Sequence, residues 1–186
     1  MSKKLTNIIK ACQRGDRASQ KQLYSLFASR LYGVCLRYSH NEEDAKDLLQ
    51  EGFIKIFKNL KQYKHSGSFE GWMRKIIVNT ALEKFRKSTR SLAIENEDYM
   101  DTLQMDYEHV LEELGYKDLM RMVQELSEQY RIVFNLYVIE GYTHKEISQK
   151  LNIGEGTSKS NLSRARELLK EKVRRQYKVN KAGKVI

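Results

Sequence analysis

Apolar residues recur every three or four positions along most of this chain, which is the spacing of amphipathic helices. A short first helix is predicted from Leu5, Ile8, Ile9 and Cys12. Gly15 interrupts the pattern, and Asp16 is expected to cap a second helix. The apolar face of that second helix is expected to comprise Leu23, Leu26, Phe27, Leu31, Val34, Cys35 and Tyr38.

Two further helices are predicted before residue 90. Asn41 and Asp44 resemble a capping box at the start of the third helix. Its inward stripe is Ala45, Leu48, Leu49, Phe53, Ile56, Phe57 and Leu60. After a loop over residues 63–69, a fourth helix is expected over about residues 70–89. Its inward residues are Met73, Ile77, Ala81 and Phe85, and its other face carries Lys75, Asn79, Leu82, Arg86 and Arg90.

The last third of the chain has the pattern of a helix-turn-helix. A helix around residues 119–126 precedes a second one that Ser127 is expected to cap and Gly141 to end. Thr143 and Glu146 form a predicted capping box for a short helix ending near Leu151. A turn over residues 152–156 and a long basic helix over about residues 157–177 follow.

Composition supports an all-α fold of two small domains. The chain has no proline and only 10 glycines in 186 residues, which disfavours sandwiches and barrels rich in tight turns. Charge is unevenly distributed: residues 1–90 hold 19 Lys and Arg against 8 Asp and Glu, residues 91–116 hold 8 acidic residues and no basic one, and residues 117–186 hold 15 against 8. Two basic modules on an acidic tether are therefore expected, a pattern typical of polyanion binding. Residues 178–186 are interpreted as a frayed basic tail.

Two blocks of sequence resemble a known family. Residues 47–55 (DLLQEGFIK) and 69–80 (FEGWMRKIIVNT) resemble sigma domain two, and residues 141–151 (GYTHKEISQKL) and 156–166 (GTSKSNLSRAR) resemble the helix-turn-helix of sigma domain four. Both blocks stand in the family's order without a domain three between them, which is the layout of extracytoplasmic-function sigma factors. The resemblance divides the chain into domain two over residues 5–90, a linker over 91–116 and domain four over 117–177.

The resemblance implies a transcription initiation factor and not an enzyme. Such a factor binds core RNA polymerase, through its β′ and β subunits, and directs it to promoter DNA. Domain four is expected to read the minus-thirty-five element as duplex, and domain two to bind the minus-ten element and capture a flipped base. Many relatives are held inactive by an anti-sigma factor, a further partner that this sequence neither shows nor excludes.

A second stripe on the third helix is the predicted polymerase-docking surface. Its members share one helical face: Asp47, Gln50, Glu51, Ile54 and Lys58. Taken alone, the stripe also fits a solvated helix face. The resemblance assigns it to the coiled coil of the β′ subunit.

Two sets of residues are predicted to bind DNA by the resemblance. The minus-ten set is His65, Ser66, Ser68, Trp72, Lys75, Asn79 and Arg86, with Asn79 lining the pocket for the flipped base and Trp72 either supporting that pocket or simply packing. The minus-thirty-five set is Thr157, Lys159, Ser160, Ser163 and Arg164. Ser158 stands where the family usually has an apolar residue, so it is expected either to weaken packing or to bond back to the helix backbone. Asn161 replaces a common basic residue, which leaves the inherited promoter specificity open.

Other classes of protein explain less of the sequence. A stand-alone helix-turn-helix regulator accounts for residues 117–177 but not for residues 47–80, and a helical RNA-binding or adaptor protein accounts only for the charge. No catalytic, metal or cofactor site is expected, because the four histidines are scattered without ligand or nucleophile spacing. Cys12 and Cys35 are interpreted as buried free thiols. With no signal peptide and no apolar span, the protein is expected to be cytoplasmic and not inserted into a membrane.

Overall fold

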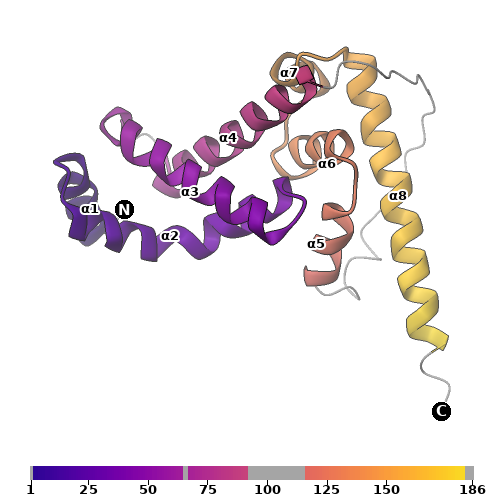
Figure 1. Ribbon diagram of the computed structural model, residues 1–186, viewed down its shortest axis with the longest axis horizontal. Helices are drawn as coiled ribbons and strands as arrows, with labels where there is room; N and C mark the ends of the chain where they lie inside the picture. Colours follow the sequence, from indigo (N-terminus) through magenta and orange to yellow (C-terminus); the bar gives the residue numbers. More distant parts are fainter. Residues whose placement is uncertain (1, 65–66, 92–115, 183–186) are drawn as a thin grey trace. The chain divides into compact units, whose positions relative to one another are not determined.

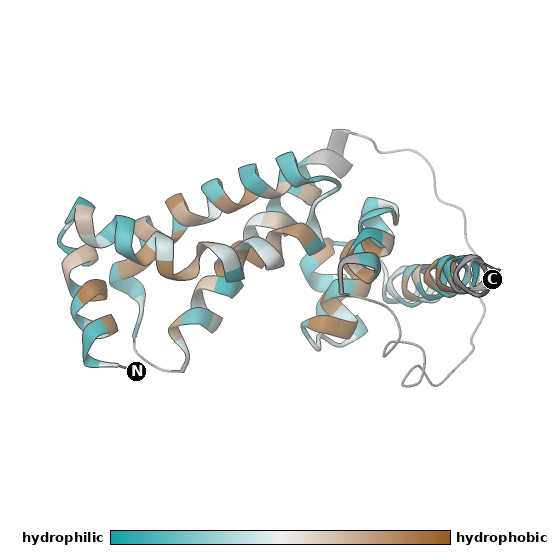
Figure 2. Cartoon of the chain, turned by 90° about the horizontal axis from the view of Figure 1, so that it is seen from below, coloured by the Kyte–Doolittle hydropathy of each residue, from teal (hydrophilic) through white to brown (hydrophobic). Residues whose placement is uncertain are grey.

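The structure is a computed structural model that describes residues 2–64, 67–91 and 116–182, and every regular element in these ranges is helical (Figure 1). The chain divides into two compact units, residues 1–87 and 88–186, which are described separately. In both units the helices carry hydrophobic and hydrophilic residues on different faces (Figure 2). The expected linker over residues 91–116 falls almost entirely outside the described residues.

The first unit contains α1 (Lys3–Gln13), α2 (Arg17–Tyr38), α3 (Glu42–Asn59), the short 3-10 helix η1 (Leu60–Gln62) and α4 (Phe69–Ser91). Two predicted caps are confirmed: the backbone N–H of Ser19 donates to the Asp16 carboxylate at 2.8 Å, and that of Asp44 donates to the Asn41 side chain at 2.8 Å. Between α1 and α2, Gly15 has a φ of +88°, which a residue with a side chain rarely adopts. Local sequence therefore fixes where α2 and α3 begin.

The core of the first unit follows the predicted stripes with two corrections. The inward residues predicted on α3 and α4 are buried, apart from Phe57, which is half-buried. Leu26 was expected on the apolar face of α2 but is 53% exposed, since it lies about 100° around the helix from Phe27. Leu82 was expected on the polar face of α4 but is buried, because Val78 one turn earlier is also buried and widens the apolar face.

Gly52 permits a close approach of α3 to α4. A Cβ atom added at Gly52 would overlap Cδ1 of Ile77, and Cα of Ile77 would lie only 3.9 Å away. Ile77 is fully buried and has little freedom to move aside. The glycine within the domain-two block therefore has a packing role.

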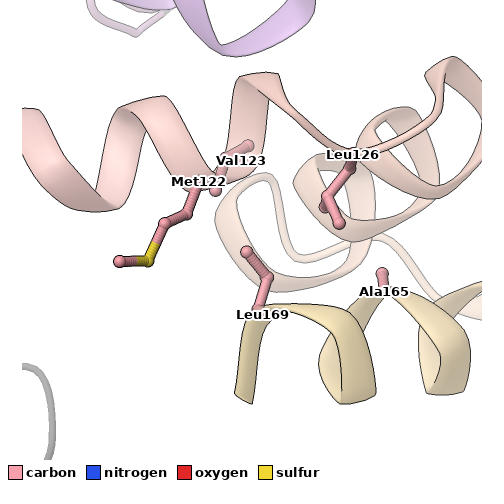
Figure 3. Close-up of a cluster of buried hydrophobic side chains, with 5 residues drawn as sticks. All are labelled: Met122, Val123, Leu126, Ala165 and Leu169. Carbon is pink, nitrogen blue, oxygen red and sulfur yellow. The ribbon is translucent and has the colours of Figure 1, made fainter. Parts of the chain in front are cut away.

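The second unit contains α5 (Tyr116–Gln124), α6 (Glu128–Phe134), the π-helical turn η2 (Asn135–Ile139), α7 (His144–Leu151) and α8 (Glu155–Ala182). Met122, Val123 and Leu126 pack against Ala165 and Leu169 of α8 (Figure 3). α8 begins two residues earlier than predicted and continues to Ala182, so residues 178–182 of the expected frayed tail are helical; residues 183–186 lie outside the described residues. Ser127 occupies the N-cap of α6 without a side-chain hydrogen bond.

Arg131 is the largest fully buried side chain of the second unit and was not anticipated from the sequence. Its Nη1 atom donates to the carbonyl oxygens of Gln124 and Leu126 at 2.8 and 2.9 Å. These carbonyls lie at and just beyond the end of α5, where the helix itself provides no donors. The guanidinium group therefore ties α6 to the end of α5.

Within the described ranges, no helix is long and apolar enough to cross a membrane. The same residues contain no group of three His, Cys, Asp or Glu side chains arranged to hold a metal ion.

Candidate functional sites

The predicted docking stripe lies on the face of α3 opposite its buried residues. Asp47, Gln50, Ile54 and Lys58 are exposed, and Ile54 is 47% exposed although it is a large apolar residue. Its neighbour Phe53 is 3% exposed. Two adjacent residues of α3, about 100° apart around the helix, thus lie on different faces, one in the core and one in solvent.

Glu51 differs from the other members of the stripe because it is half-buried and paired across helices. Its carboxylate lies 3.2 Å from Nζ of Lys55 and 3.5 Å from Nζ of Lys84 on α4, and Lys55 also contacts Glu83 at 2.6 Å. Burial raises the pKa of Glu51, but hydrogen bonds and positive charge from Lys55 and Lys84 outweigh it, so its pKa lies below the usual value. Glu51 therefore also contributes to the contact between α3 and α4.

An aromatic cluster supports the loop before α4. The ring of Trp72 stacks on that of Phe69 with centroids 5.6 Å apart, and the Tyr63 ring lies 4.9 Å from Phe69 and 5.4 Å from Trp72. The Tyr63 hydroxyl donates to the carbonyl of Gly67 at 3.0 Å. Trp72 thus packs beside the loop, and Tyr63 holds it, a role that the sequence analysis missed although both flanks of the loop are aromatic.

The predicted minus-ten residues are only partly brought together. Lys75, Asn79 and Arg86 are exposed on one face of α4. Ser68 is exposed, and its hydroxyl accepts a weak hydrogen bond from the N–H of Gly71 at 3.3 Å, at the start of α4. His65 and Ser66 lie outside the described residues.

The helix-turn-helix is formed by α7, a three-residue turn and α8. The predicted capping box is present: the Thr143 N–H donates to the Glu146 carboxylate at 2.8 Å, and the Glu146 N–H donates to the Thr143 hydroxyl at 3.3 Å. Asn152 ends α7 in the left-handed conformation with a φ of +57°. The turn is shorter than predicted because residues 155 and 156 already belong to α8.

The five predicted minus-thirty-five residues lie on the side of α8 away from its core stripe. Thr157, Lys159 and Arg164 are exposed, and Ser160 and Ser163 are half-buried. Both cations have partners within the helix: Lys159 lies 3.4 Å from Glu155, and Arg164 lies 3.0 Å from Glu167. Hydroxyl and cationic groups on one exposed helix face suit contacts to base edges and phosphates of duplex DNA.

The two unusual positions of α8 are both buried. Ser158 is fully buried, and its hydroxyl lies 3.0 Å from Nδ1 of His144. Ser158 therefore has a partner that the sequence did not predict, a side chain of α7. Asn161 is only 8% exposed and belongs to the inward side of α8.

Family comparisons match both units of the chain. The family described as Sigma-70 region 2 matches residues 23–91, and the family described as Sigma-70, region 4 matches residues 116–169. Among solved structures, the sigma factor RpoE of Bartonella quintana, in complex with the anti-sigma factor NepR, covers 83% of this chain and 96% of its own, with 21% identity and a TM-score of 0.49.

Curated relatives extend the similarity over most of the chain. The ECF RNA polymerase sigma factor SigE of Mycolicibacterium smegmatis is 33% identical, over 84% of this chain and 63% of that protein. SigW of Bacillus subtilis is 26% identical, over 89% of this chain and 95% of its own length, and the sigma-E factor of Haemophilus influenzae is 27% identical, over 93% and 98%. With regions 2 and 4 both matched and in this order, the chain belongs to the extracytoplasmic-function sigma factors, non-catalytic initiation factors that direct RNA polymerase to promoters.

Proposed function

We propose that this sigma factor uses three separate surfaces, each of which binds a different partner. The exposed stripe of α3 docks on the β′ subunit of core polymerase, the exposed face of α4 with its preceding loop binds the minus-ten element, and the exposed face of α8 binds the minus-thirty-five element. The observation that carries the proposal is that most family-matched positions on α3, α4 and α8 that the structure describes lie away from the buried stripes of their helices. Glu51 and Trp72 differ, since both are half-buried.

The chemistry of each surface fits its proposed partner. The α3 stripe combines Asp47 and Gln50 with exposed Ile54, and an apolar anchor ringed by polar groups is typical of protein interfaces. On α4, Lys75 and Arg86 can contact phosphates while Asn79 can bond the edge of an extruded base. The aromatic cluster around Trp72 would support the wall of that pocket.

Polymerase dependence is the central expectation. Each DNA-binding surface is small, so we expect the free protein to bind DNA weakly and with strong salt dependence. Work at promoters would place the protein in the cytoplasm with the polymerase. An anti-sigma factor is a further proposed partner; the Bartonella quintana sigma factor was solved in complex with one.

Run-off transcription with purified core polymerase tests this proposal. The template would carry a promoter selected by the reconstituted holoenzyme from a randomised DNA library. We expect specific transcripts only when core enzyme and this protein are both present. Nanomolar, sequence-specific binding by the isolated protein at physiological salt, without stimulation of core enzyme, would instead identify a stand-alone regulator.

A further inference from the structure

A polar contact joins the two helices of the helix-turn-helix from inside. Ser158 is fully buried near the start of α8, on the same side as Leu162 and Ala165. Its hydroxyl is hydrogen-bonded to Nδ1 of His144, the first residue of α7, at 3.0 Å. A hydrogen bond is directional and short-ranged, so it restricts rotation and sliding of α8 on α7 more tightly than an apolar contact of equal size.

The imidazole of His144 is itself held in place from two sides. Its ring stacks on Tyr137 of η2, with centroids 4.6 Å apart and planes inclined by 26°. Immediately before it, the capping box of Thr143 and Glu146 fixes the first turn of α7. Burial lowers the pKa of His144, with the positive charge of Lys159 acting in the same direction, so the ring is neutral near pH 7. A neutral, immobilised ring is a suitable anchor for the Ser158 hydroxyl.

We propose that the His144–Ser158 hydrogen bond positions the recognition helix, setting the rotation of α8 so that its exposed face meets the base edges of the minus-thirty-five element. The inference rests on the proposed role of α8 in binding that element. Ser158 lies directly between Thr157 and Lys159 in the sequence, so a rotation at Ser158 displaces both proposed contacts. His144 and Ser158 are positioning residues, since neither needs to touch DNA.

Matched substitutions separate the hydrogen bond from the ring stack. His144→Phe keeps an aromatic ring for Tyr137 but removes Nδ1, whereas His144→Asn places a polar atom near the position of Nδ1 but removes the ring. Ser158→Ala removes the partner hydroxyl, and the double variant His144→Phe/Ser158→Ala completes a cycle. Because His144 is only half-buried, its variants keep the test open even if Ser158→Ala folds poorly.

The measurement is the affinity of the full-length protein, bound to core polymerase, for duplex minus-thirty-five DNA selected by the wild-type holoenzyme. A panel of single-base variants of that duplex gives the discrimination ratio. We expect His144→Phe and Ser158→Ala each to weaken cognate binding about threefold to tenfold, the effect of one net hydrogen bond, and to lower the discrimination ratio. His144→Asn should retain most of the cognate affinity and of the discrimination ratio. The double variant should lose no more affinity than either single variant.

Unchanged discrimination in folded His144→Phe and Ser158→Ala proteins would overturn the proposal, as would additive losses in the double variant. Circular dichroism establishes that each variant is folded at the assay temperature. Arg164→Ala, which removes a proposed DNA contact, distinguishes the two levels of failure. If Arg164→Ala and Lys159→Ala leave duplex binding unchanged, the proposed role of α8 is wrong; if they weaken it while the His144 and Ser158 variants do not, only the positioning role is wrong.

Discussion

Adjacent residues of α3 offer a direct test of the polymerase-docking surface. Phe53 is 3% exposed and packs on Tyr24 and Phe57, with ring centroids 4.6 and 5.8 Å away. Truncating a buried phenylalanine to alanine leaves a cavity, so Phe53→Ala should destabilise the first unit by about 3–5 kcal/mol. Ile54→Ala removes a side chain that is already 47% exposed and introduces a better helix former, so stability should change by less than about 0.5 kcal/mol.

For polymerase binding, in contrast, we expect a clear loss from Ile54→Ala, although this substitution leaves stability nearly unchanged. If Ile54 is buried on docking, truncation removes several methylene equivalents at about 0.8 kcal/mol each when fully buried. Because about half of the side chain is already covered in the free protein, the loss should be near 1 kcal/mol, about fivefold in affinity. Asp47→Arg, a charge reversal on the same exposed face, should weaken binding further, because it places a positive charge against a surface expected to be complementary to an acidic residue.

Trp72 makes the stability measurement specific to one unit. It is the only tryptophan in the chain and lies in the first unit, so its fluorescence in a urea titration follows that unit alone. Polymerase affinity is measured in parallel by titrating core enzyme with labelled protein. Glu51 is a poor choice for charge reversal, because its pairs with Lys55 and Lys84 would be replaced by repulsion within the domain. Folded Ile54→Ala and Asp47→Arg proteins that bind core polymerase normally would refute the docking surface.

Four further predictions address DNA binding and folding. Arg164→Ala should weaken recognition of the duplex minus-thirty-five element by about 1–3 kcal/mol, measured by titration of holoenzyme on linear promoter DNA. Asn79→Ala should spare that step and impair capture of single-stranded minus-ten DNA. Activity equal to that of the wild type on duplex, pre-melted and single-stranded templates would contradict the pocket assignment. Gly52→Val should cost about 1–3 kcal/mol in Trp72 fluorescence unfolding, because the added side chain meets Ile77. Burial and the charge of Lys159 lower the pKa of His144, so the unfolded chain binds more protons; its contribution to stability is present above about pH 6.5 and is lost as pH falls. His144→Phe should flatten that part of the pH dependence in circular dichroism melts, and an unchanged profile would assign it to other groups.

The sequence predicted the helix starts that are set by a capping side chain and a nearby backbone N–H. The caps at Asp16, Asn41 and Thr143 each use a side chain and a backbone N–H three residues apart, so no distant contact was needed to place them. Periodicity likewise separated Phe53 from Ile54 on α3. Periodicity did not place the edges of each stripe, as Leu26 and Leu82 show, because neighbouring helices decide which flank is covered.

Contacts between distant residues were beyond the reach of the sequence pattern. Glu51 and Lys84 lie 33 positions apart, and nothing in either helix alone indicates that they meet. Ser158 and His144 lie 14 positions apart. In the sequence, Ser158 only interrupts an apolar stripe, and the structure is needed to show that His144 lies beside it. Arg131 was equally unpredictable, since its partners are backbone carbonyls and not a complementary side chain.

The ion pairs on α8 bear on why this protein depends on polymerase. Lys159 and Arg164 are each paired with a glutamate of their own helix in the free protein, so contact with DNA replaces an exposed ion pair and lowers the net gain from each cation by up to about 1 kcal/mol. We therefore expect this face to bind random DNA more weakly than unpaired cations would, which matters because non-specific sites are in large excess. Binding to core polymerase through α3 would hold α8 near the promoter and raise its effective concentration there. On the proposed function, weak affinity of α8 for DNA and a separate docking surface on α3 would together restrict promoter recognition to the holoenzyme.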